Sequence, residues 1–299
     1  MPISPAQYSN LWNQYLALLA GTPQPLYQAY LDRENFLEDY LDIFRGRDTR
    51  ATRGLSGSHP FHAQLSDPLF VAPKIAYVLI GEAAHSSSAT FFYNPAHLKS
   101  TNWLRSPLKA FGLGIAYPKT SKEKIDGLFA LAMKGFLLLD LYPFTLAYSS
   151  TMRAGIDYIP FWEQLVDRIN GLSAHGLIQD DCLLAFSGPA KTHHQIVVQL
   201  HNQRLPGVAH RIGLPRDCTL SWGTNILTFG TTSIPPTHEK ALICRWHFPG
   251  KIFHLDGNAN NPVDGSFNFY APKYKCETWD GSFVNGPTSK FIKVAFGLP

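Results

Sequence analysis

The sequence predicts an α/β protein with a three-layer α/β/α core and a mostly parallel central sheet. Four short apolar runs, at 75–80, 135–144, 182–188 and 225–230, are typical of parallel strands covered on both faces. Stretches with helical character separate them, at 121–134, 158–172 and 189–204. Strands that alternate with helices indicate a layered α/β sheet.

The rest of the chain is assigned to the same single domain, residues 1–299. Residues 1–46 form a helical N-terminal extension, 70–245 the core sheet and its helices, and 248–299 a loop-rich C-terminal segment. That last segment is rich in Asn, Gly and Pro. It has turn signals at Asp264-Gly265 and Asp280-Gly281, so short strands joined by loops are expected there.

Two helices are predicted at the N-terminus. Apolar residues recur at helical spacing from Tyr8 to Leu19, and Gly21-Thr22-Pro23 ends that pattern. A second periodic stretch runs from Leu26 to Phe44. Residues 47–68 are polar and aperiodic, which predicts a surface loop. Its arginines, Arg47, Arg50 and Arg53, are expected to be solvated, and a phosphate contact is the alternative.

Composition limits the functions that are compatible with the chain. The net charge of +4 permits an anionic partner such as DNA without requiring one. The four cysteines show no C-x-x-C spacing, so neither a zinc cluster nor a disulfide framework is expected. No basic-then-apolar leader and no apolar run of about 20 residues is present, which favours a cytoplasmic protein without a membrane span. No cofactor-binding motif is found, and the sequence gives no oligomeric state.

Polar and aromatic residues follow each apolar run, where the sites of parallel sheets gather. The first run leads into Gly81, Glu82 and His85, and then Phe91-Phe92-Tyr93. The second contains Asp140 and Tyr142, the third leads into Ser187-Gly188, and the fourth precedes a loop that ends in His238.

These motifs, in this order, resemble the uracil-DNA glycosylase superfamily. VLIGEAA (78–84) is similar to the Gly-Glu-Ala start of that family's site, although Ala84-His85 stands where the family has Pro-Gly. LLLDLYP is similar to the family's second strand, whose asparagine reads the base, with Asp140 in the asparagine's place. FSGPA resembles the family's third strand, which leads into Gly-x-x-Ala and a helix. The family's DNA-inserting loop has only 232–238 as its counterpart. The resemblance covers about residues 70–245.

The resemblance implies hydrolysis of the N-glycosidic bond of a modified or damaged base, hence a DNA-repair hydrolase with DNA as its partner. Glu82 would orient water or offset the cationic sugar, and His85 or His238 would hydrogen-bond the leaving base. Phe91 or Phe92 would stack on the base. Tyr142, Ser187 and Gly188 would complete the base site, while Arg105 and Lys109 would contact phosphates.

Asp140 changes what such a site can read. Asparagine both donates and accepts hydrogen bonds, whereas an ionised aspartate only accepts. Facing O4 of uracil, Asp140 would oppose one acceptor with another, so a base edge with an amino group or two N–H donors is expected. Alternatively, Asp140 merely caps a neighbouring helix or turn.

Two other functions stay open. Ala84-His85, Asp140 and the altered loop would also fit a non-catalytic protein of the same fold that binds nucleic acid or a small molecule. An unrelated hydrolase with Glu82 and His85 as an acid–base pair is the third hypothesis.

Overall fold

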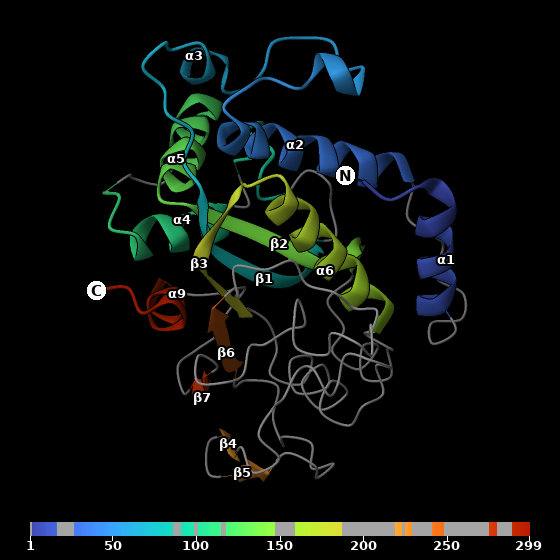
Figure 1. Cartoon of the computed structure of the whole chain (residues 1–299), viewed down its shortest axis with the longest axis vertical. Helices are drawn as coiled ribbons and strands as arrows, with labels where there is room; N and C mark the ends of the chain where they lie inside the picture. Colours follow the sequence, from blue (N-terminus) through green and yellow to red (C-terminus); the bar gives the residue numbers. More distant parts are fainter. Residues whose placement is uncertain are drawn as a thin grey trace.

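The computed structural model of the chain describes residues 2–16, 27–85, 91–98, 101–114, 118–146, 159–186, 219–222, 225–228, 241–247, 275–279 and 289–299. Its helices are α1 (Pro5–Leu16), α2 (Tyr27–Arg45), η1 (Ala51–Arg53), α3 (His62–Leu65), α4 (Thr101–Ala110), α5 (Ser121–Met133), α6 (Ile159–Ala174) and α9 (Ser289–Phe296). Its strands are β1 (Ile75–His85), β2 (Phe136–Leu146), β3 (Ile178–Phe186), β4 (Thr219–Trp222), β5 (Asn225–Thr228), β6 (Ala241–His247) and β7 (Lys275–Trp279). Figure 1 shows their arrangement, with α6 lying along β2.

The central sheet has the strand order β2-β1-β3-β6-β7. β1 is parallel to both β2 and β3, while β6 is antiparallel to β3 and β7 is antiparallel to β6. A mixed α/β fold is therefore confirmed, and the parallel pairing predicted for the first three apolar runs is correct. The sheet is parallel only in this half, because β6 and β7 add an antiparallel edge.

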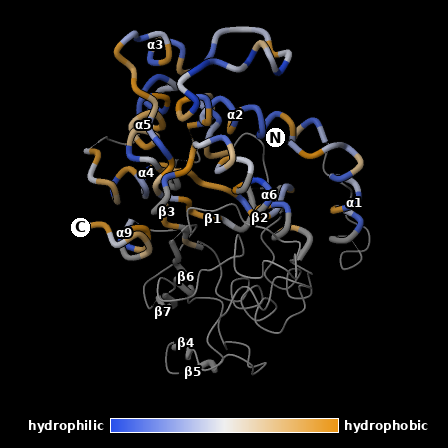
Figure 2. Tube along the Cα trace, viewed as in Figure 1, coloured by the Kyte–Doolittle hydropathy of each residue, from blue (hydrophilic) through white to orange (hydrophobic). Residues whose placement is uncertain are grey.

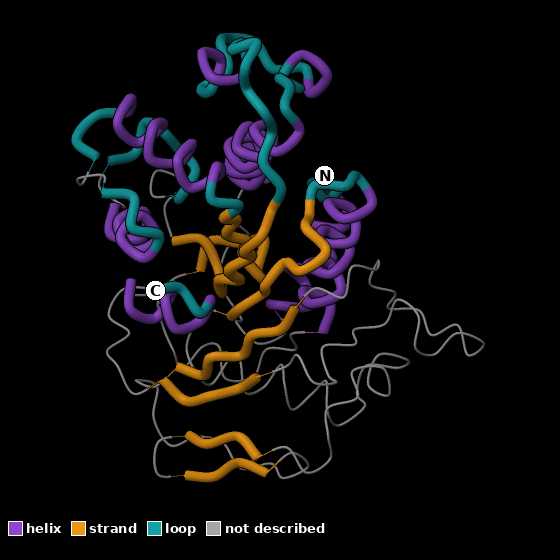
Figure 3. The backbone as a smooth tube through the Cα atoms, turned by 60° about the vertical axis from the view of Figure 1, so that its left-hand side comes forward, coloured by secondary structure: helices purple, strands orange, loops and turns teal. Residues whose placement is uncertain are grey.

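The fourth apolar run was assigned to the wrong sheet. β5 (Asn225–Thr228) pairs antiparallel with β4 in a separate two-stranded sheet, beyond β7 in Figure 3. The two-residue connection, Gly223-Thr224 in the sequence, has the length that favours a hairpin. A short apolar run alone does not reveal its partner strand, and here the nearest strand in the chain provides it.

β1 and β2 both continue further than their sequences predict. β1 does not end at Ile80 but runs to His85, and its backbone pairs with β2 beyond Gly81. Glu82 thus lies within β1 and does not follow it, while Asp140 lies within β2, as the second apolar run predicts. The pairing of β1 with β3 reaches Ile80–Phe186, so the next residues of β1 extend along β2. The continued ladder supplies backbone partners, which outweigh the weak strand preference of Gly and Asp.

The helices follow their predicted positions closely. α5 begins with a capping box, in which the Thr120 hydroxyl accepts from the Glu123 amide at 3.2 Å and the Glu123 carboxylate accepts from the Thr120 amide. Gly135 joins α5 to β2 with a φ of +74°, and a Cβ there would lie 2.7 Å from the Lys74 oxygen. Helices α4 and α9 were not predicted, and neither were the short η1 and α3, which lie in the stretch 47–68 that was predicted to be a loop. The predicted helix at 189–204 lies outside the described residues.

One cluster of buried apolar side chains connects these elements, and it includes members from α1, α2, β1, β2, α6 and α9. The Tyr40 hydroxyl donates to the Phe136 oxygen at 2.6 Å, which fixes α2 to β2. Yet α2 is largely hydrophilic along its length (Figure 2), and several of its charged residues are buried. None of the described helices has the length and apolar character needed to cross a membrane.

Candidate functional site

Gly81 and Asp140 face each other across the parallel β1–β2 pair. A Cβ at position 81 would lie only 2.7 Å from Oδ1 of Asp140, so the carboxylate leans over β1 at the place where it has no side chain. Glycine is needed here for this close approach, and not for an unusual backbone angle. The glycine of the Gly81-Glu82 motif therefore positions the acid of the second strand.

Asp140 borders a cavity of about 80 Å³ that also contains Phe91 and Tyr142. These three predicted site residues come from two segments that are separated by about 50 residues in the sequence. The volume is small beside the roughly 300–1,000 Å³ of drug-sized ligand pockets. The cavity therefore fits the edge of a single ring better than a nucleotide cofactor.

The other polar walls come from two helices. Tyr30, Arg33 and Glu34 of α2 line the cavity, together with Arg168 of α6. Sequence reasoning missed all four, because α2 was read as an extension and α6 only as a covering helix. The available signal was the row of charged residues on α2, at positions that a buried helix would fill with apolar side chains.

Two guanidinium groups hold fixed positions at the cavity. Arg168 binds the Glu34 carboxylate with both terminal nitrogens, at 3.1 and 2.5 Å. Arg33 is only 4% exposed and donates to the Pro143 oxygen at 2.6 Å. Burial lowers the pKa of Arg33, but Tyr8, Asp140 and Glu34 act in the opposite direction, and a guanidinium stays charged at neutral pH.

The aromatic segment after β1 divides between core and cavity. Phe91 and Phe92 are 7% and 6% exposed, but only Phe91 lines the cavity. The Tyr93 hydroxyl donates to the Leu138 oxygen at 2.8 Å and accepts from the Leu138 amide at 2.7 Å. Tyr93 thus fixes the segment against β2, with Phe92 packed edge-on to its ring.

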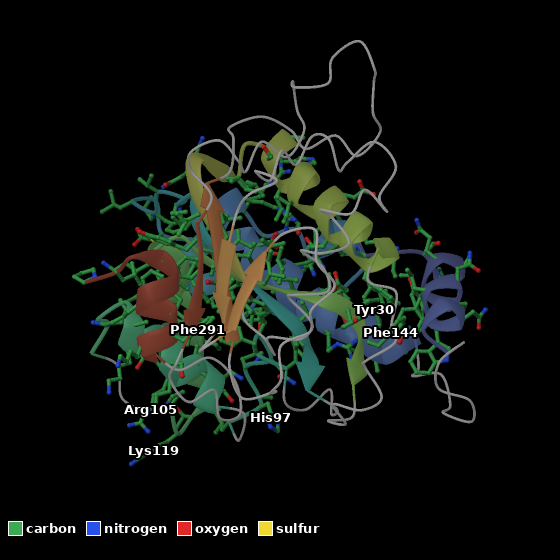
Figure 4. The ribbon with its side chains drawn as sticks, turned by 90° about the horizontal axis from the view of Figure 1, so that it is seen from below. Tyr30, His97, Arg105, Lys119, Phe144 and Phe291 are labelled. Carbon is green, nitrogen blue, oxygen red and sulfur yellow. The ribbon has the colours of Figure 1, made fainter. Side chains whose placement is uncertain are left out.

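The remaining predicted site residues either lie away from the cavity or belong wholly or partly to the undescribed part of the chain. The backbones of Glu82 and His85 lie in β1 beside the cavity strand β2, and their side chains lie outside the described part. Ser187, Gly188 and His238 lie outside the described residues altogether. Arg105 and Lys109 are exposed on α4 and do not line the cavity. In Figure 4, Arg105 and Lys119 lie at one edge of the molecule, far from the buried Tyr30 and Phe144 on the other side.

Two of the three arginines of the polar loop are paired with buried acids and are not free to bind an anion. Arg50 and Arg53 bind the two oxygens of Asp39, at 2.7 and 2.5 Å, while Arg47 is exposed. The prediction of solvated arginines is wrong for Arg50 and Arg53, because the buried acids of α2 attract them.

Asp39, Asp42 and His59 place ligand atoms within 4.8 Å of one another, as a metal site would. Asp42, however, already accepts from Arg45, from the amide and hydroxyl of Thr49 and from His59. His59 accepts the Phe61 amide on Nδ1, so its Nε2 carries the proton directed at Asp42. A cation would have to displace these donors, and three arginines already balance the charge. We regard this group as a structural ion-pair network.

The chain has no match among protein-family models, curated proteins or solved structures.

Proposed function

We propose that the protein is a uracil-DNA glycosylase-like enzyme that hydrolyses the N-glycosidic bond of a modified base in DNA, on a three-layer α/β/α fold. The observation that carries the proposal is the meeting of Phe91, Asp140 and Tyr142 in one cavity beside Gly81-Glu82. The resemblance requires a stacking ring and a base-reading side chain next to the Gly-Glu strand, and this arrangement supports it.

The proposed reaction assigns separate roles to these groups. Phe91 stacks on the extruded base, and Asp140 accepts a hydrogen bond from its edge. Glu82, the residue after Gly81, orients the attacking water and offsets the cationic sugar. His85 or His238 donates to the leaving base, and Arg105 and Lys109 contact the phosphates. Glu82 provides the sharpest test, because the reaction needs its carboxylate whichever base is read.

The test is base release from single- and double-stranded oligonucleotides that carry uracil, hypoxanthine, xanthine or an alkylated base. Wild-type protein is expected to release at least one of them, and Glu82→Ala to lose about 100-fold or more in rate, in line with the loss of a general acid–base group. Asp126→Ala is the control, since Asp126 is a partly exposed acid of α5 that pairs with the exposed Lys122 and does not line the cavity.

If no base were released from any of these oligonucleotides, the proposed glycosylase activity would be contradicted. Salt-dependent binding of the same oligonucleotides without release would instead favour the non-catalytic DNA-binding alternative.

A further inference from the structure

Two separate parts of the sequence carry no acidic side chain. None occurs between Glu82 and Glu123, and none follows Asp280, yet both parts contain lysines, and the first also contains Arg105. The first part includes α4 and the second includes α9. On α2, by contrast, acids and arginines share one helix. A surface built from α4 and α9 would therefore attract anions over its whole extent.

The fold brings these two helices together. α4 and α9 pack against each other beside the central sheet, as Figure 1 shows. Phe111, which follows α4, and Phe296, the last residue of α9, both pack edge-on against Tyr77 of β1, with centroids 5.3 and 5.2 Å apart. The two helices thus lie on the same face of the sheet. Because each turns its apolar side toward the core, their other sides face solvent together.

Among the residues of α4 and α9, every charged side chain is cationic. Arg105 and Lys109 are exposed and lie one turn apart, so they share one side of α4. On α9, Lys290 is exposed, and Lys293 lies one turn further on, where its ammonium group donates to the Pro299 oxygen. These four cations define the α4–α9 face, whose position is fixed by the packing of the two helices.

The kind of anion follows from what the α4–α9 face lacks. A helix that binds a bilayer needs a free apolar side, and the apolar side of α9 is already used: Phe291 and Ile292 are fully buried in the core. The face therefore fits a polyanion that is bound through charge alone. The phosphate backbone of a nucleic acid is such a partner, and lysine and arginine are the side chains that contact it.

We propose that the α4–α9 face binds the phosphate backbone of DNA, so that the C-terminal helix α9 is part of the nucleic-acid interface. This deepens the proposed function, which gives phosphate contacts to Arg105 and Lys109 alone, and it rests on that function only for DNA as the partner. α9 lies outside residues 70–245, which the glycosylase resemblance covers. Its role therefore comes from the packing of α9 beside α4 and from its own lysines.

The experiment measures binding of the full chain to fluorescent single- and double-stranded DNA without a damaged base, by anisotropy at several salt concentrations. Because no base is to be released, the measurement does not depend on turnover. The logarithm of the binding constant is expected to fall linearly with the logarithm of the salt concentration, by about 0.9 per phosphate contacted on a duplex. No binding, binding that salt does not weaken, or binding only of RNA of the same sequence would overturn the inference.

Variants of one exposed lysine test α9 itself. Lys290→Gln is expected to weaken DNA binding about three- to tenfold at low salt and to reduce the salt slope by about 1, because one phosphate contact is lost. Lys290→Arg keeps the charge and should bind as the wild type does. Arg47→Gln is the matched control, since Arg47 is exposed in the loop after α2, which lies away from α9 in Figure 1. An unchanged affinity and slope in Lys290→Gln, or an equal loss in Arg47→Gln, would overturn the role of α9.

The result is distinguishable from failure of the glycosylase proposal. DNA binding that depends on Lys290, without base release from any modified oligonucleotide, would retain this inference and reject the enzyme. Base release together with DNA binding that Lys290→Gln leaves unchanged would retain the enzyme and reject the role of α9. Binding to vesicles of equimolar phosphatidylcholine and phosphatidylserine, but to no oligonucleotide, would assign the face to a membrane and overturn the inference.

Discussion

At the scale of single residues, Gly81 shows how an absent side chain shapes the site. The Asp140 carboxylate occupies the space beside Gly81 that a side chain would fill. We expect Gly81→Ala to push the carboxylate aside and to lower the free energy of unfolding by about 1–3 kcal/mol, as overpacking of a buried site does. Urea titration measures the stability.

Gly171→Ala is the matched control. Gly171 lies in α6 with no heavy atom within 4 Å of its Cβ position, so the same change should leave stability equal or about 0.5–1 kcal/mol higher. Equal effects at the two positions would contradict the steric role of Gly81.

Lys124 carries a charge inside the protein. It is 1% exposed, and its ammonium group donates to the His97 oxygen at 2.7 Å, which ties α5 to the segment that carries Phe91. Burial lowers the pKa of Lys124 to about 8 from an ordinary value of 10.5. Between these values the unfolded chain binds more protons than the folded one, so stability rises with pH.

Lys124→Met removes the pH dependence of stability that Lys124 causes. We expect the stability of wild type relative to Lys124→Met to rise between pH 8 and 10.5, by at most about 3 kcal/mol, the equivalent of that pKa difference. Denaturant titrations at pH 7.5 and 10.5 check it. The exposed Lys122→Met should run parallel to wild type over the same interval, and a parallel curve for Lys124→Met would refute the prediction.

At the scale of elements, α2 is held by charges where its position calls for an apolar helix. Asp42 is fully buried and accepts from Arg45, Thr49 and His59, which fixes the loop after α2. Burial would raise the pKa of Asp42, but these partners outweigh it and hold the pKa below its ordinary value. Its contribution to stability is therefore present above that value, 3.8, and is lost as the pH falls through the lower, folded-state pKa.

We expect Asp42→Asn to lower the free energy of unfolding by about 1–3 kcal/mol at pH 7, because it removes one of the two acids that pair with the partly buried Arg45 and Arg53 and weakens the hydrogen bonds that Asp42 accepts. Thermal unfolding and the hydrogen exchange of the Thr49 amide measure the effect. Asp32→Asn, an exposed acid on the same helix, should change stability by less than about 0.5 kcal/mol. A loss at Asp42 that is no larger than at Asp32 would show that the network contributes little.

The elements also show how far the sequence predicts this molecule. Periodicity located α1, α2, α5 and α6, and the first three apolar runs located the parallel strands, since these signals are local. The partner of β5 and the continuation of β1 past Gly81 depend on neighbouring strands, and no local pattern contains them. At the site, Phe91, Asp140 and Tyr142 were expected from the order of motifs. Arg33 and Arg168 were not, because a charged residue on a helix is ordinarily solvated.

At the scale of the whole molecule, the N-terminal helices are part of the core. The rings of Tyr8 and Trp12 pack edge-on against Phe144 of β2, with centroids 5.1 and 5.0 Å apart. Arg168 and Glu34 join α6 to α2 across 134 residues of sequence. Residues 1–46 thus precede the sheet in the sequence, but in the structure they pack against it as part of the core.

A chain that lacks residues 1–46 would remove Tyr8 and Trp12 from Phe144, the Tyr40 hydroxyl from the Phe136 oxygen, and Glu34 from Arg168. We expect it to lose near-ultraviolet circular dichroism and cooperative thermal unfolding, because the removed contacts exceed the about 5–15 kcal/mol by which domains are stable. A cooperative transition in this shortened chain would show that the sheet folds alone, and Arg33 would then be an addition to a complete site.

Tyr40→Phe provides a graded version, since it removes only the hydroxyl bonded to Phe136 and should cost about 1 kcal/mol of unfolding free energy. Tyr27→Phe is its control, because that hydroxyl donates to the Ile3 oxygen within the N-terminal region.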